Sequence, residues 1–244
     1  MREPVLEHPT VLIHNHTVIS VTLLGISGQL EFLSRLLLLL AILSSEPAWF
    51  RDHHSNITMA SIKKTPPKSW TNVTSDAELV KHLLELYICW EYPILASLNK
   101  EHFQQDFNSG SSRYCSPLLV NALLALGSRF SDRPEARADP NDPFTAGDAF
   151  FEEAKRLFWE QTDHQDLTAV QAIGIMSIRE ASCGRDVDSR YFAGQSVRLA
   201  IEMGLHRLDD DGGGDDYRTV QLITLWGAFS LDQYVFICPG SLSL

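Results

Sequence analysis

The residues of this 244-residue chain best suited to chemistry are the aspartates of the run DDDGGGDD, Asp209–Asp216. Aspartate-rich motifs bind divalent cations when a rigid backbone holds several carboxylates together. Three glycines interrupt this run and make its backbone flexible, so we expect a solvated surface loop. The alternative hypothesis is a helical, Mg²⁺-dependent enzyme that uses this loop.

The cysteines and histidines lack the spacing of a metal site. The four cysteines are dispersed and none forms a C-x-x-C pair: Cys89, Cys115, Cys183 and Cys238. This pattern indicates neither a zinc site nor a disulfide framework, so we expect buried free thiols. The pairs His14/His16 and His53/His54 have no cysteine or carboxylate set at ligand spacing. We therefore predict no catalytic, cofactor-binding or metal-binding residue.

The overall charge argues against nucleic-acid binding by this chain alone. The formal net charge is −11, whereas binding to phosphates needs clustered lysines and arginines. The tightest basic run, residues 63–68, contains three lysines around two prolines. We interpret it as a solvated linker, with a nuclear import signal as the alternative.

One leucine-rich segment, Gln29–Ser45, raises the question of a membrane. Its longest apolar run, Leu36–Leu43, has eight residues, and about twenty are needed to span a bilayer. Extending the segment backwards brings in Glu31 and Arg35, whose insertion costs several kcal/mol. We expect a helix that is buried or covered by a partner, and no membrane. The alternative is a membrane-associated helical protein anchored through residues 29–43.

The elements that would position these residues are helices. Apolar residues recur at intervals of three and four, and no alternating strand pattern recurs, which predicts an all-α bundle of about seven helices. We expect residues 1–74 to be an irregular, linker-like region with a leucine-rich helix at 29–45. Residues 75–244 should form the helical domain.

Several details of these helices can be predicted from local signals. The expected N-terminal caps are Ser75 in a capping box with Glu78, Asn99, Ser116 before a proline, Asp166, and Asp188 or Ser189. The first helix should bury Leu79, Leu83, Leu86 and Trp90 on one face, and the last should span residues 219–237. Arg185 and Asp186 form either a regulatory ion pair or exposed charges.

An ordered series of segments resembles one known family. These are LLELYICWEYPIL (83–95), HFQQDF (102–107), SPLLVNALLALGSRFS (116–131), FFEEAKRLFW (150–159), DLTAVQAIGIMSIRE and GRDVDSRYFAGQSVRLAIEMGLHR within 166–207, and LWGAFSLDQYV (225–235). The series resembles the fungal-specific transcription factor domain. That domain is the middle homology region of fungal activators with a binuclear zinc cluster, including the xylanolytic and nitrogen-assimilation types.

The resemblance implies a non-catalytic regulatory domain that controls RNA polymerase II transcription of metabolic genes in the nucleus. It also implies zinc and DNA binding through a separate six-cysteine module, which four dispersed cysteines cannot supply. DNA would therefore be a partner only through that module, and a co-regulator protein or a small-molecule effector would be a further partner. Because the family domain continues beyond the position of Leu244, we expect an incomplete C-terminus. The last helix would then expose apolar residues and favour self-association.

Overall fold

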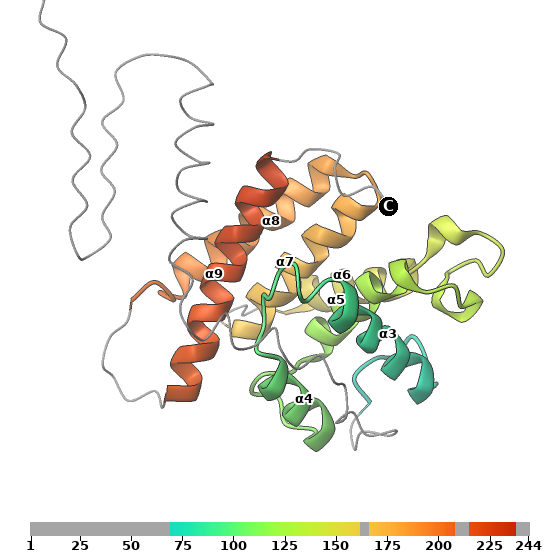
Figure 1. Ribbon diagram of the computed structural model, residues 1–244, viewed down its shortest axis with the longest axis horizontal. Helices are drawn as coiled ribbons and strands as arrows, with labels where there is room; N and C mark the ends of the chain where they lie inside the picture. The colour runs from blue at the N-terminus through green and yellow to red at the C-terminus, as the bar shows by residue number, and fades with distance from the viewer. Residues whose placement is uncertain (1–68, 162–165, 208–214, 238–244) are drawn as a thin grey trace, which may run out of the picture.

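The computed structural model describes residues 69–161, 166–207 and 215–237 (Figure 1). Within these ranges the chain forms seven α-helices and no strand, with one isolated antiparallel bridge between Arg137 and Ala146. The predicted all-α fold is confirmed. The leucine-rich segment 29–45 and residues 209–214 of the acidic run lie outside the described residues.

The helices follow one another in the order predicted. Their bounds are α3 (Ala77–Trp90), α4 (Lys100–Ser109), α5 (Pro117–Gly127), α6 (Asp148–Glu160), α7 (Leu167–Ser182), α8 (Asp186–Glu202) and α9 (Asp215–Ile237). Three short 3₁₀ helices, η2 (Ser128–Phe130), η3 (Pro134–Ala136) and η4 (Pro143–Thr145), lie between α5 and α6. In Figure 1, α3 to α6 occupy one half of the molecule, and α7, α8 and α9 run together in the other.

Side-chain caps fix where most of these helices begin. The side chains of Asn99, Ser116 and Asp166 accept bonds from the first free N–H groups of α4, α5 and α7, as predicted. The cap of α3 is Asp76, one residue later than predicted. Its carboxylate accepts bonds from the N–H groups of residues 78 and 79, at 2.9 and 3.1 Å, so Ser75 lies outside the helix.

The prediction for the start of α8 was also wrong. The helix begins at Asp186 with no side-chain hydrogen bond to its first turn among the described residues. The cause is the short α7–α8 turn: Gly184 has φ +72° and the N–H of Arg185 donates to the carbonyl of Glu180 at 3.0 Å. At its other end, α8 is followed by Gly204, which adopts the left-handed conformation with φ +69° that commonly ends a helix.

The core is built around α5 and α7, which are buried almost throughout. Helix α5 packs against α3, α6 and α7, and α7 also packs against α8 and α9. Glycine allows the closest contacts: a Cβ at Gly127 would lie 2.2 Å from the backbone oxygen of Leu83. A Cβ at Gly147 would lie 2.2 Å from the backbone oxygen of Ala125.

The segment before α3 belongs to the packed structure. The indole of Trp70 is buried and donates to the carbonyl of Phe107 at 3.1 Å. The amide of Asn121, which is fully buried in α5, donates to the carbonyl of Trp70 at 3.2 Å and accepts from Thr71 at 2.8 Å. These contacts attach residues 70 and 71 to α4 and α5.

Burial in α3 and α9 differs in part from the predicted faces. Leu79 and Leu83 are buried, but Leu86 is half-buried and Trp90 is 59% exposed. In α9, Leu225 is buried in the cluster between α7, α8 and α9. The helix begins at Asp215, four residues earlier than expected. On the same helix Trp226 is 43% exposed, so part of the apolar exposure that we expected for the last helix is present.

Candidate functional site

The most unusual side chain in the described structure is Arg179 in α7, because its charged group is only 1% exposed. It lies in the segment SIREAS, where α7 passes the first two turns of α6. Its guanidinium pairs with Asp148 of α6 and sits over the ring of Phe151, with 4.4 Å between the guanidinium carbon and the ring centroid. A buried cation is stable only when anions and ring faces surround it in this way.

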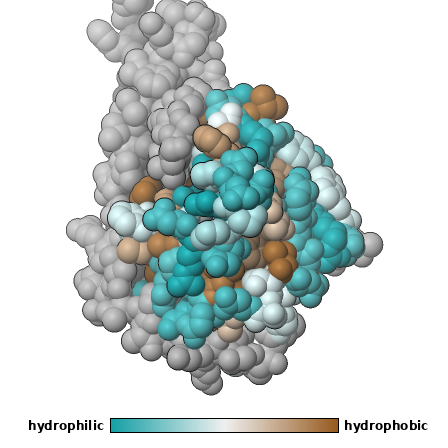
Figure 2. Space-filling model, turned by 90° about the vertical axis from the view of Figure 1, so that its right-hand side faces the viewer, coloured by the Kyte–Doolittle hydropathy of each residue, from teal (hydrophilic) through white to brown (hydrophobic). Residues whose placement is uncertain are grey.

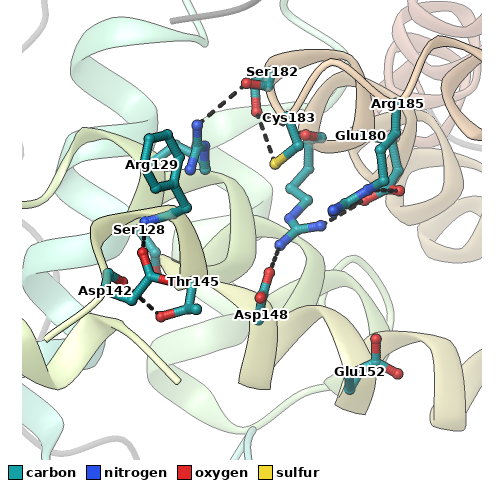
Figure 3. Close-up of polar contacts among 12 residues, drawn as sticks. Ser128, Arg129, Asp142, Thr145, Asp148, Glu152, Glu180, Ser182, Cys183 and Arg185 are labelled. Atoms are coloured by element: carbon teal, nitrogen blue, oxygen red, sulfur yellow. Dashed lines mark hydrogen bonds and ion pairs between the residues drawn. The ribbon is translucent and has the colours of Figure 1, made fainter. Parts of the chain in front are cut away.

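Glu180 is the second buried charge of the cluster. Its side chain is 4% exposed and accepts from Arg179 at 2.6 Å. Arg185 also binds this carboxylate with two nitrogens, at 2.6 and 2.8 Å. Figure 3 shows Asp148, Glu180 and Arg185 converging from α6, α7 and the α7–α8 turn. We call Asp148, Arg179, Glu180 and Arg185 the charge cluster.

The cluster fixes the α7–α8 turn in two ways. The main-chain carbonyl of Glu180 accepts the N–H of Arg185, and its side chain binds the guanidinium of the same residue. On the other side of the turn, Arg129 donates to the carbonyl of Ser182 at 3.2 Å (Figure 3). The turn is therefore connected to α6 through the charge cluster and to η2 through Arg129.

Burial shifts the proton affinity of the cluster. Desolvation raises the pKa of Glu180 to about 7, against the opposing attraction of Arg179. The arginines compensate this carboxyl when it is ionised, and protonation would release part of that attraction. In the ionised form, the carboxylate is bound by Arg179 and Arg185 and so holds the turn between α7 and α8. It contains no nucleophile beside a base, which is the arrangement that covalent catalysis requires.

The ion pair between Arg185 and Asp186 that the sequence suggested is not formed. Arg185 pairs with Glu180, five residues earlier, and not with its neighbour Asp186. Arg198 on α8 forms an ion pair with Glu202 of the same helix at 2.9 Å. Arg179 and Glu180 were missed, because the sequence alone did not show that Asp148 packs against α7.

The described cysteines are not gathered into a metal site. Cys115, before α5, is buried as predicted. The prediction of buried thiols was wrong for Cys89, which is exposed at the end of α3, and for Cys183, which follows α7 and is partly exposed. Across residues 69–161, 166–207 and 215–237, no group of three or more histidine, cysteine or acidic side chains could hold a metal ion. No described helix is long and apolar enough to span a membrane.

Comparison with known proteins places these features in a family. Residues 84–244 match the family described as "Fungal specific transcription factor domain". The nitrogen assimilation transcription factor nirA of Emericella nidulans is 44% identical over 170 residues, which cover 67% of this chain and 19% of nirA. The nitrogen assimilation transcription factor nit-4 of Neurospora crassa is 40% identical over 186 residues, or 72% of this chain and 17% of nit-4.

A more distant relative is the notoamide biosynthesis transcriptional activator notL' of Aspergillus versicolor, 32% identical over 123 residues, half of this chain and 19% of the relative. The chain thus spans about a fifth of the length of these relatives. No solved structure shows significant similarity to it.

The family match covers most of the chain and includes every residue of the charge cluster. These relatives are transcriptional regulators and not enzymes, which confirms the predicted regulatory domain and gives no support to a magnesium-dependent enzyme or a membrane anchor. The chain belongs to the fungal-specific transcription factor domain family.

Proposed function

We propose that this domain controls RNA polymerase II transcription of nitrogen-assimilation genes in the nucleus. The observation that carries the proposal is the 44% identity to nirA over 170 residues, joined by 40% identity to nit-4 over 186. Both relatives are named as nitrogen assimilation transcription factors. DNA contact would belong to a separate zinc-cluster module, consistent with the net charge of −11 here.

The proposed mechanism is a change in helix packing driven by a metabolite or a co-regulator protein. Such a partner can shift the domain only by as much as its affinity differs between the two packings. The charge cluster is the element we assign to this change. It joins α6, α7 and the turn that leads into α8, and breaking one of its buried charge pairs is strongly unfavourable, so a change of pairing would favour one packing over another.

A tethering assay tests the proposal. The whole chain is fused to a bacterial DNA-binding domain in a filamentous fungus that carries a matching reporter gene. We expect reporter activity to depend on the nitrogen source and a fluorescent fusion to enter the nucleus. Glu180→Gln should alter the response, whereas Glu152→Gln, at an exposed site on α6, should not. Reporter activity that is the same on every nitrogen source would contradict the proposal.

A further inference from the structure

The outward face of α8 carries apolar residues where a surface helix usually carries polar ones. Val187 is 73% exposed, and Tyr191 and Ile201 are each 47% exposed. The opposite face is buried in the core through residues such as Phe192 and Ala200. Helix α8 therefore exposes three apolar side chains on the side opposite its buried face in the described structure.

The outward residues follow the spacing of a helix-pairing seam. They are separated by four, three, four and three positions: Val187, Tyr191, Gly194, Arg198 and Ile201. This alternation places all five on one stripe, as at the a and d positions of a coiled coil. The stripe is about 21 Å long at 1.5 Å per residue. We call these five residues the α8 seam.

The residue at the middle of the seam is a glycine. Glycine inside a helix is unfavourable relative to alanine, so it needs a local reason. At Gly194 the described structure provides none: φ is not positive, and a Cβ would have no atom within 4 Å. A reason outside the monomer is the close approach of a second backbone at this point.

The order of residues on the seam shows which partner fits. The seam is nearly symmetric about Gly194, with Tyr191 three residues before it and Arg198 four residues after. In an antiparallel pair of two copies, each Tyr191 would lie opposite the partner's Arg198. The Arg198 guanidinium binds Glu202 of its own helix through Nε at 2.9 Å, and its flat face could stack on the tyrosine ring, which gives two cation–π contacts. Each Val187 would lie opposite the partner's Ile201. A parallel pair would instead place the two Arg198 guanidinium groups together, which is unfavourable.

We propose that two copies of this chain associate through the α8 seam, antiparallel and crossing at Gly194. This surface differs from the α9 side on which we expected self-association from the sequence. A single pair of helices of this length buries less than the roughly 1,200 Å² typical of stable complexes. The association is therefore weak, with a Kd on the order of micromolar or above, and responds to local concentration.

Sedimentation velocity of the full chain over a wide concentration range tests the proposal. We expect the mass to rise from monomer towards dimer, and Tyr191→Glu to weaken the association about tenfold or more. Trp159→Glu is the matched control, since Trp159 is 64% exposed on α6, outside the seam. A chain that stays monomeric, or equal weakening by both variants, would overturn the proposal.

The variant Gly194→Ala tests association separately from folding stability, because the two should change in opposite directions. An added Cβ meets open space in the monomer, so helix propensity should raise its Tm. At the crossing point the same Cβ would push the two helices apart and weaken the dimer. Unchanged association in this variant would contradict a crossing at Gly194.

Cross-linking tests the orientation. An equal mixture of Val187→Cys and Ile201→Cys chains should form mixed disulfide dimers faster than either variant alone. Preferential cross-linking of each variant to itself would refute the antiparallel arrangement.

Discussion

Replacing Glu91 with glutamine should stabilise the domain at high pH. Glu91 ends α3 and is only 8% exposed. Desolvation raises its pKa to about 7 from the ordinary value of 4.5. Its place at the helix C-terminus adds to this effect, because the helix dipole is negative there.

The sign and size follow from proton linkage. A carboxyl whose pKa is higher in the folded state contributes stability below about pH 4.5, and this stability is lost as the pH rises to about 7. The difference between 4.5 and about 7 corresponds to at most about 3 kcal/mol. Glutamine resembles the protonated form at every pH, so Glu91→Gln should gain up to this amount at pH 8 and under about 1 kcal/mol at pH 5.

Urea unfolding followed by far-UV circular dichroism at the two pH values measures this gain. Glu85→Gln is the control on the same helix. The Glu85 side chain is 39% exposed and lies 3.7 Å from Lys81, so its loss should cost under about 1 kcal/mol at either pH. If Glu91→Gln were less stable than the unmodified chain at pH 8, the carboxylate would be a favourable charge there. The reasoning from burial would then be refuted.

Three further substitutions test the packing by the same unfolding measurement. Arg179→Met removes one of the two cations that bind the buried Glu180 and leaves Asp148 without its partner, which should cost about 3–5 kcal/mol. A neutral result would mean that the cluster does not form. Gly127→Ala forces a Cβ to within 2.2 Å of a main-chain oxygen of α3 and should destabilise by about 1–3 kcal/mol or more; an increase in stability would exclude this close approach. Asn121→Ala removes the buried hydrogen bond to the carbonyl of Trp70 and should cost about 1–3 kcal/mol. Unchanged tryptophan fluorescence together with unchanged stability would show that Asn121 does not hold Trp70 in place.

The sequence was most informative where the interaction is local. Asn99, Ser116 and Asp166 each cap a helix through a backbone N–H two or three residues away, so the residue type and its position suffice. The left-handed turn at Gly204 is equally local. In contrast, Ser75 and Asp76 both have cap chemistry, and the choice between them depends on how α3 approaches the core.

The charge cluster could not be predicted, because it depends on distant parts of the chain. Arg179 and Asp148 are 31 residues apart, and only the packing of α6 on α7 brings them together. Trp90 illustrates the opposite error: it continues the apolar spacing of α3, but the core ends before it and leaves it 59% exposed. Periodicity identifies the face of a helix and not the point at which its neighbour stops.

The central position of α7 has a consequence for how the protein is made. One face of α7 is covered by α9, through contacts such as the 2.7 Å bond between Gln171 and Thr224. Ribosomes add about 5–20 residues per second, so α9 is completed roughly 3 to 11 seconds after α7. During this interval the nascent chain presents an uncovered apolar surface, and we expect its yield in cells to depend on chaperones that bind such surfaces during translation.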